Sequence, residues 1–177
     1  MVIWMTGLSG SGKTTLCHAI YRLSKWSIPE LVVLDGDQVR AAFGSDLSYR
    51  EEDRITQVKR LQGLTKMLSE QGLVVIVAVV YAHPDLLTWN RCHLKDYFEV
   101  YLESALETVR RRDPKGLYAK AASGEAAHLV GVDIPWRPPV SPDLMINTDA
   151  PEPPEVLARR VMAAIPRFAR VLEQDGG

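Results

Sequence analysis

Residues 7–15, GLSGSGKTT, have the spacing of a phosphate-binding loop, G-x-x-x-x-G-K-T. Glycines let the backbone curl until successive N–H groups point at one anion, and the following helix N-terminus adds partial positive charge. Lys13 is long enough to reach the β- and γ-phosphates of a nucleotide, and Thr14 offers a hydroxyl to Mg²⁺. A chance glycine-rich turn is disfavoured because every signature position is filled. The motif predicts phosphate contacts from Gly7, Ser9, Gly10, Ser11, Gly12, Lys13, Thr14 and Thr15.

Two carboxylates follow the second apolar stretch of the chain. Residues 31–34 (LVVL) lead directly into Asp35, Gly36 and Asp37. Carboxylates at the C-terminal end of a parallel strand project into the crevice where α/β proteins bind ligands. An ordinary aspartate-capped turn would look the same, since D-G is common in turns. Beside a phosphate-binding loop we favour functional roles for Asp35 and Asp37, with Arg40 near the same crevice.

Basic residues at two further places suggest contacts with anions. Arg54 stands near the start of an expected helix, where it would clamp an anionic substrate, whereas Lys59 and Arg60 fit a solvated face. Residues 110–115 (RRRDPK) form a local cationic patch, and D-P followed by K-G makes a hinge. We expect a mobile lid over about residues 110–137 that brings cations over a transferring phosphoryl group. The alternative is a solvated run of charge at a helix end, and which of the three arginines enters the site stays open.

Bulk properties restrict the class of protein. A chain of 177 residues has the length of about one domain, so we expect a single domain over 1–177. A net charge of −1 argues against a broad nucleic-acid-binding face. The two cysteines are far apart and lack metal-ligand spacing, which is typical of reduced thiols in a cytoplasmic protein. The longest apolar run, residues 73–82, is too short to span a membrane, and the first residues do not resemble a signal peptide.

Apolar periodicity predicts strands that alternate with helices. This alternation implies an α/β fold with a doubly wound, parallel, five-stranded sheet and helices on both faces. Ser48 and Glu51 resemble a capping box at the start of the long helix. The expected strands are 2–6, 31–34, 74–80, 97–102 and 144–147. The expected helices are 13–26, a short one from 38, 51–71, 85–94, 104–112, 119–125 and 154–172.

Several longer motifs resemble those of the adenylyl-sulfate kinase (APS kinase) family, and the resemblance covers nearly the whole chain. The matching segments are GLSGSGKTT at 7–15, LDGDQVR at 34–40, DR at 53–54, FEVY at 98–101, RDPKGLY at 112–118, GVDIP at 131–135 and PDL at 142–144. The resemblance implies a P-loop kinase that transfers the γ-phosphoryl group of ATP to the 3′-hydroxyl of adenosine 5′-phosphosulfate, a step of sulfate assimilation. It also implies Mg²⁺ as cofactor and, by family habit, a homodimer.

The resemblance also implies roles for individual residues. Lys13 and Thr14 would hold ATP and Mg²⁺, and Asp35 would act as the base for the 3′-hydroxyl or hold metal-bound water. Lys13, Asp35 and Asp37 are then the expected catalytic residues, Thr14 and Asp35 the metal ligands, and Arg112 a further ATP contact. The expected acceptor-binding residues are Asp37, Arg40, Tyr49, Arg54, Gln57, His83, Lys115, Gly116, Leu117 and Leu129.

The chain departs from the family pattern at the acceptor pocket. Residues 81–84 read YAHP where the family usually has S-P-Y-R, so a serine and a substrate-binding arginine are missing, and His83 faces either substrate or the protein's own structure. Gln57 replaces an asparagine, and of two phenylalanines that commonly sandwich the adenine, Tyr49 matches the first and Leu129 replaces the second. These departures favour, as an alternative, the same chemistry on a nucleotide such as cytidine diphosphoramidate in polysaccharide modification.

Two other interpretations have less support. One is a regulatory ATPase without a small-molecule acceptor. The D-G-D turn and the K-G-L-Y segment disfavour it, because they indicate an acceptor pocket that such a protein would not need. A catalytically dead paralogue is disfavoured because Lys13, Thr14, Asp35 and Arg40 all remain.

Overall fold

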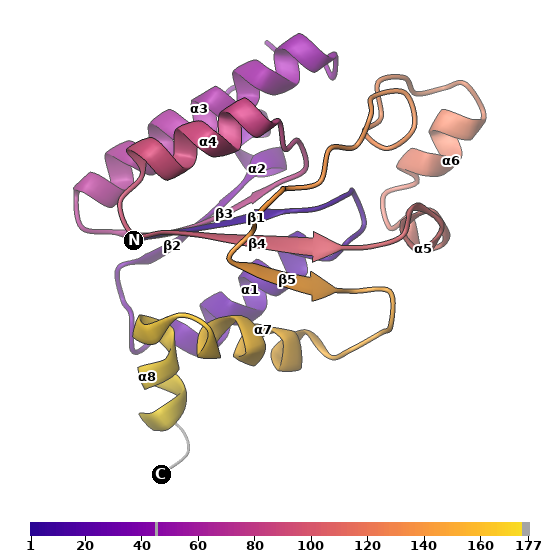
Figure 1. The fold of residues 1–177 in the computed structure, drawn as a ribbon. Helices are drawn as coiled ribbons and strands as arrows, with labels where there is room; N and C mark the ends of the chain where they lie inside the picture. The colour runs from indigo at the N-terminus through magenta and orange to yellow at the C-terminus, as the bar shows by residue number, and fades with distance from the viewer. Residues whose placement is uncertain (45, 175–177) are drawn as a thin grey trace.

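Five parallel strands form one sheet at the centre of the protein (Figure 1). The computed structural model describes residues 1–44 and 46–174. The strand order is β2-β3-β1-β4-β5, and every neighbouring pair is parallel. This arrangement confirms the predicted doubly wound α/β fold. The strands are β1 (Val2–Thr6), β2 (Leu31–Asp35), β3 (Val74–Val79), β4 (Tyr97–Glu103) and β5 (Leu144–Asn147).

Helices cover both faces of the sheet (Figure 1). Ile3 and Met5 of β1 face one core and Val2 and Trp4 face the other, because successive side chains of a strand point to opposite faces. None of the helices in the described residues is long and apolar enough to cross a membrane. The first core is covered by α1 (Lys13–Ser24), α7 (Pro154–Ala163) and α8 (Pro166–Gln174), and the second by α2 (Gly36–Ala42), α3 (Glu51–Glu70) and α4 (Pro84–His93).

The expected lid lies beyond the C-terminal end of β4, where the sheet's functional loops gather (Figure 1). It contains the end of α5 (Leu106–Arg112) and all of α6 (Leu117–Ala122). Between them Asp113 and Gly116 both have positive φ, at 21° and 65°, so the chain turns sharply at the predicted hinge. Gly116 is the N-cap of α6, and this left-handed turn starts the helix two residues earlier than the sequence predicts.

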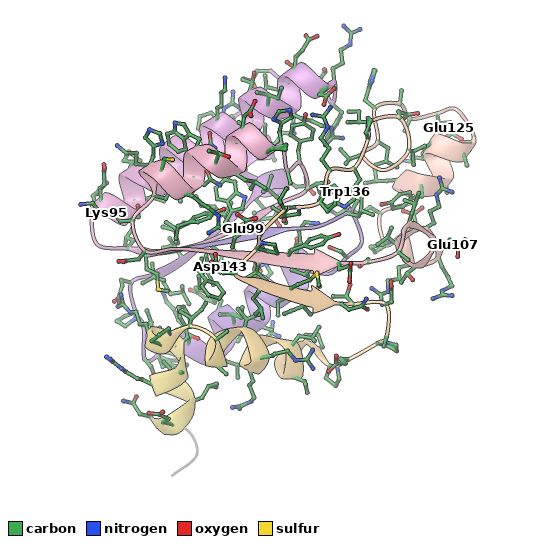
Figure 2. All side chains as sticks on the ribbon, in the orientation of Figure 1. Lys95, Glu99, Glu107, Glu125, Trp136 and Asp143 are labelled. Atoms are coloured by element: carbon green, nitrogen blue, oxygen red, sulfur yellow. The ribbon has the colours of Figure 1, made fainter. Side chains whose placement is uncertain are left out.

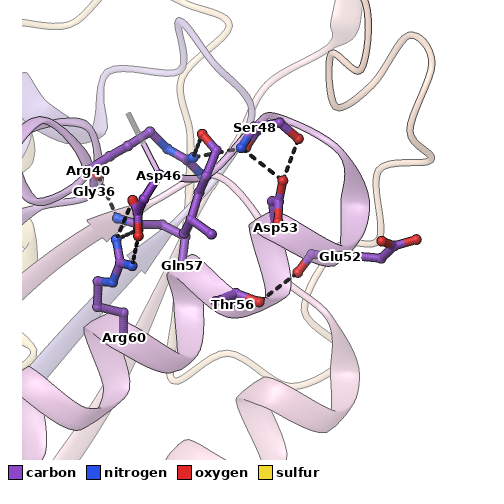
Figure 3. Close-up of polar contacts among 10 residues, drawn as sticks. Gly36, Arg40, Asp46, Ser48, Glu52, Asp53, Thr56, Gln57 and Arg60 are labelled. Atoms are coloured by element: carbon purple, nitrogen blue, oxygen red, sulfur yellow. Dashed lines mark hydrogen bonds and ion pairs between the residues drawn. The ribbon is translucent and has the colours of Figure 1, made fainter. Parts of the chain in front are cut away.

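Two local predictions were wrong. The expected closing helix is divided, because Pro166 has no N–H to donate and its ring disfavours a continuous helix, so α7 ends at Ala163 and α8 begins anew. The capping box does not form either, because the N-cap of α3 is Arg50 and not Ser48, so Glu51 is the first residue of the helix. Instead the Ser48 N–H and hydroxyl donate to Asp53 Oδ2 at 2.8 and 2.5 Å (Figure 3).

A buried polar cluster joins α4 to the far edge of the sheet. Glu99 is buried on β4, and its backbone N–H donates to Asp143 Oδ2 at 2.7 Å, just before β5 (Figure 2). Arg91 of α4 pairs with both carboxylates, at 3.4 Å to Glu99 and 3.2 Å to Asp143. Burial raises the pKa of Glu99, and the Arg91 guanidinium opposes that rise. The cluster therefore ties the chain that returns from the lid to β4.

Candidate active site

The phosphate-binding loop connects β1 to α1, as its motif predicts. Gly10 and Gly12 have φ of 80° and 98°, a region that favours glycine, so the chain can curl here. Lys13 is buried under this curl, and its Nζ donates to the carbonyls of Gly7 and Leu8 at 2.9 and 2.8 Å. Burial lowers the pKa of Lys13 to about 8. The ammonium is thus held by neutral carbonyls at the place where the motif expects phosphates.

Thr14 and Asp35 meet beside this loop. Thr14 Oγ1 donates to Asp35 Oδ2 at 2.6 Å, although 21 residues separate them. Asp35 Oδ1 accepts from the backbone N–H groups of Asp37 and Gln38 at 2.9 and 3.2 Å, so the same carboxylate caps α2. The sequence presented an aspartate-capped turn and a functional carboxylate as alternatives. In the structure Asp35 caps α2 and also lines the cleft, so the two interpretations do not exclude each other. A hydroxyl and a carboxylate oxygen are hard oxygen donors, which suits Mg²⁺.

The lid contacts the carboxylate side of the site. Lys115, in the turn between α5 and α6, forms an ion pair with Asp37 at the start of α2. Hydrogen bonding to Asp37 raises the pKa of Lys115, so this side chain stays charged. Both side chains are exposed, and an exposed pair adds little stability. The contact brings a cation from the lid next to the predicted site of phosphoryl transfer.

The second contact of the lid reaches the phosphate-binding loop itself. The Tyr118 hydroxyl of α6 donates to the Ser9 carbonyl at 3.0 Å, and its ring is buried. Arg112, the last residue of α5, donates from Nη2 to the Thr148 carbonyl at 2.5 Å, beyond β5. Of the three neighbouring arginines, Arg112 lines the cleft described below. The sequence left open which of the three arginines enters the site, and Arg112 is the one that lines this cleft.

Two guanidinium groups lie close to one aromatic ring of the site. The Cζ atoms of Arg40 and Arg54 lie 4.8 and 5.4 Å from the centre of the Tyr49 ring. Arg40 donates to the carbonyls of Leu47 and Ser48 (Figure 3). Arg54 donates to the carbonyls of Tyr49 and His128, at 3.0 and 2.8 Å. Burial, and then the charge of Arg40, lower the pKa of Arg54.

Both arginines are held by neutral oxygens. Among the ion pairs of residues 1–44 and 46–174, none within 4.0 Å includes Arg40 or Arg54. The role of Arg54 as a clamp for an anionic substrate stays a prediction, and no carboxylate in this part of the chain neutralises its charge at that distance.

Gln57 and Arg60 lie one and two turns further along α3 (Figure 3). Gln57 is buried, and its Nε2 donates to the Gly36 carbonyl at 3.2 Å. Arg60 pairs with Asp46 at 2.5 Å, which lowers the pKa of Asp46, and it does not line the cleft. The sequence predicts a solvated face for Arg60, whereas its side chain is only 18% exposed and lies over the Phe43 ring.

These groups line one cleft of about 470 Å³ at the C-terminal ends of the strands. β1, which leads into the phosphate-binding loop, is the middle strand of the sheet; β2 and β3 lie on one side of it, and β4 and β5 lie on the other. Predicted residues that line it are Ser9, Gly10, Gly12, Lys13, Thr14, Thr15, Asp35, Asp37, Arg40, Tyr49, Arg54, Gln57, Arg112 and Lys115.

Six predicted residues do not line this cleft: Gly7, Ser11, His83, Gly116, Leu117 and Leu129. Gly7 and Ser11 still position Lys13, because the Gly7 carbonyl and the Ser11 hydroxyl accept hydrogen bonds from its ammonium group. His83 is the N-cap of α4, where its Nδ1 accepts from the Asp85 N–H at 3.3 Å. Leu129 is buried in the core that α2, α3 and α4 cover.

Sequence reasoning missed part of the cleft wall on the β3 side. Val79, Val80 and Tyr81 at the end of β3 line it, together with Val58 of α3. The Tyr81 hydroxyl donates to Glu51 Oε1 at 2.5 Å. The position of residue 81 directly after the central strand was the available signal, because such positions face the ligand crevice.

Comparison with known proteins agrees with this geometry. Residues 1–147 match the family model described as adenylylsulphate kinase. An adenylyl-sulfate kinase of Paraburkholderia xenovorans is 39% identical over 149 residues, covering 84% of this chain and 83% of that protein. The cytidine diphosphoramidate kinase of Campylobacter jejuni is 40% identical over 146 residues, covering 82% and 85%.

A solved structure extends the similarity to three dimensions. The Mycobacterium tuberculosis APS kinase CysC, in complex with AMPPNP and APS, superposes with a TM-score of 0.85 at 34% identity, covering 93% of this chain and 96% of that one. Sequence and structure agree along nearly the whole chain, and we conclude that this protein belongs to the adenylylsulphate kinase family.

Proposed function

We propose that the protein transfers the γ-phosphoryl group of ATP to the 3′-hydroxyl of adenosine 5′-phosphosulfate. The observation that carries this proposal is one cleft lined both by a phosphate-binding loop and by two guanidinium groups, Arg40 and Arg54, that form no ion pair within the described residues. A regulatory ATPase needs the phosphate-binding loop only. The Mycobacterium tuberculosis relative was solved with an ATP analogue and APS together, which supports two nucleotides for this cleft as well.

ATP would lie over the phosphate-binding loop, with its nucleoside toward β4 and β5. The Lys13 ammonium is next to the loop carbonyls and would exchange these neutral partners for the β- and γ-phosphates. Arg112 reaches the loop after β5 on the same side of the cleft. Its planar guanidinium is suited to contact either a phosphate or the face of a base.

Thr14 and Asp35 would hold Mg²⁺. Thr14 Oγ1 and Asp35 Oδ2 are 2.6 Å apart, and both are oxygen ligands of the kind that Mg²⁺ prefers. Within residues 1–44 and 46–174, no group of three or more His, Cys, Asp or Glu side chains could hold a metal ion. That donor set fits Mg²⁺, which is usually bound by one or two protein oxygens plus phosphates and water. When bound, the ion would neutralise charge on the phosphates.

The acceptor would lie on the side of β2 and β3. Its 5′-phosphosulfate carries negative charge that Arg40 and Arg54 are placed to bind, while the Tyr49 ring offers a stacking face. Asp37 and Gln57 line the same side and offer hydrogen-bonding groups to the ribose. Binding both nucleotides at fixed positions supplies much of the rate, because the reaction becomes effectively unimolecular.

Asp35 lies between the two halves of the cleft and has two possible roles in transfer. In one, its carboxylate takes the proton of the 3′-hydroxyl as that oxygen bonds to the γ-phosphorus and the bond to ADP breaks. In the other, it orients water on the metal ion. In both, Lys13 and Lys115 would stabilise the charge that develops on the phosphoryl oxygens. We infer that residues 110–137 close as a lid that excludes water during this step.

A second candidate function differs only in the acceptor. The Campylobacter jejuni relative phosphorylates, by its name, cytidine diphosphoramidate, and it is as similar to this chain as the adenylyl-sulfate kinases are. Leu129 is buried in the core instead of offering a second aromatic face to a base. A single stacking face, Tyr49, weakens the selection of adenine over a smaller pyrimidine.

A coupled assay of ADP release decides between these candidates. The purified protein receives ATP and Mg²⁺ with either adenylyl sulfate or cytidine diphosphoramidate, and the phosphorylated nucleotide is identified by mass spectrometry. Turnover of adenylyl sulfate to its 3′-phosphate supports the first proposal, and turnover of the cytidine compound alone supports the second. ADP release that ignores both nucleotides refutes both. Light scattering on the same sample tests our further proposal, taken from the family, of a homodimer of single-domain subunits.

A further inference from the structure

A hydrogen bond between Tyr81 and Glu51 lies at the edge of the acceptor side of the cleft. Tyr81 lines the cleft at the end of β3, and its hydroxyl donates to Glu51 Oε1 at 2.5 Å. Glu51 is the first residue of α3, 30 positions earlier in the chain. Burial and the Glu51 carboxylate raise the pKa of Tyr81, so the phenol keeps its proton and remains the donor in this contact.

Among the three acidic residues that precede Arg54 on α3, Glu51 is the one at the i, i+3 spacing. The two residues are three positions apart, and side chains at this spacing lie on the same face of a helix, close enough to pair. They do not pair here. Arg54 donates to the Tyr49 and His128 carbonyls, while Glu51 accepts from Tyr81. The Tyr81 hydroxyl therefore competes with Arg54 for the same carboxylate.

We propose that Tyr81 is a positioning residue that keeps Glu51 away from Arg54 and so preserves the positive charge that binds the acceptor. The inference rests on the proposed function, in which Arg54 contacts an anionic nucleotide. Without the phenol hydroxyl, the Glu51 carboxylate loses its partner, and a nearby guanidinium is the strongest donor within reach. The resulting pair neutralises Arg54 and places a carboxylate against the acceptor's negative charge.

Three variants, Tyr81→Phe, Glu51→Gln and the two combined, test this inference by steady-state kinetics. Tyr81→Phe removes the hydroxyl and keeps the ring, and we expect the acceptor KM to rise about tenfold, the loss of roughly one charge-assisted hydrogen bond. The kcat and the KM for ATP stay within about twofold, because neither depends on Arg54. Adding Glu51→Gln to Tyr81→Phe restores the acceptor KM, since a neutral amide does not neutralise Arg54. Glu51→Gln alone has an acceptor KM close to that of the wild type.

The matched control is Glu52→Gln, which removes a neighbouring exposed charge from the same helical turn. We expect no rescue when it is combined with Tyr81→Phe. Two results overturn the inference: an unchanged acceptor KM in Tyr81→Phe, or a raised KM that Glu51→Gln does not restore. The second result would mean that the hydroxyl contacts the acceptor directly.

A measurement without any acceptor separates this inference from the proposed function. Phenylglyoxal modifies guanidinium groups, and the labelling rate at Arg54 in the ligand-free protein is followed by peptide mass spectrometry. The rate is expected to fall in Tyr81→Phe and to recover in the double variant with Glu51→Gln. If the wild type turns over neither nucleotide, the proposed function fails, yet the labelling rates still decide whether Tyr81 holds Glu51 away from Arg54. Equal labelling rates in all three proteins refute the inference.

Discussion

Replacing Asp35 with asparagine separates its structural contribution from its chemical one. Oδ1 accepts both backbone N–H bonds that cap α2, and Oδ2 accepts from Thr14. Asparagine retains a carbonyl oxygen for the two N–H groups and presents an amide to Thr14, whose hydroxyl can accept as well as donate. Because asparagine and aspartate are equally good N-caps, we expect the free energy of unfolding to fall by less than about 1 kcal/mol.

Catalysis should respond quite differently to this change. An amide neither takes up the proton of the 3′-hydroxyl nor supplies an anionic ligand, and positioned acid–base groups contribute roughly 10²–10⁴-fold to rates. We therefore expect Asp35→Asn to lower kcat at least about a hundredfold while ATP binding changes less. The assays are coupled ADP release for kcat, calorimetric titration for ATP and thermal unfolding for stability.

The matched control for this experiment is Asp35→Ala. It removes the α2 cap as well, at a further cost of about 1 kcal/mol in stability, and it should lower kcat to a similar level. A near-normal kcat in Asp35→Asn would refute both proposed roles of the carboxylate. A large loss of stability in Asp35→Asn would show that the kinetic defect reflects a misfolded α2 start.

Three further predictions concern the phosphate-binding loop. Lys13→Ala should lower kcat by about 10² or more with an intact circular dichroism spectrum, because the lost charge acts on the transferring phosphoryl group; unchanged turnover would contradict this. Burial lowers the pKa of Lys13 to about 8, and ATP binding needs the charged ammonium. ATP affinity measured by titration should therefore stay level below about pH 8 and fall as the pH rises through that value. Lys13→Ala should remove this pH dependence. Gly7→Ala should lower both the melting temperature and ATP affinity, because an added Cβ would lie 2.6 Å from the Leu102 carbonyl oxygen, whereas Gly63→Ala, which meets nothing within 4 Å, should not.

Local sequence patterns determined the parts of this protein whose structure depends on nearby residues. The phosphate-binding loop needs a strand before it and a helix after it, and residues 2–24 contain all three. The alternation of strands and helices sufficed for the parallel sheet, because few topologies satisfy it. Pro166 was a sequence signal for the division of the last helix. The apolar periodicity continues across this proline, and for that reason one continuous helix was predicted.

Tertiary structure alone decided which of these parts meet. Thr14 and Asp35 come together because the strands before them end at the same edge of the sheet. His83 and Leu129 stand where the family has acceptor-binding residues, yet His83 caps α4 and Leu129 packs in the core, and packing of distant segments determines both outcomes. The contact of Tyr81 with Glu51 had no sequence signal, since a hydrogen bond between residues 30 positions apart depends on how α3 lies against β3. Residue types and spacing therefore predicted the chemistry, while the charge available to an acceptor depends on contacts that only the folded chain makes.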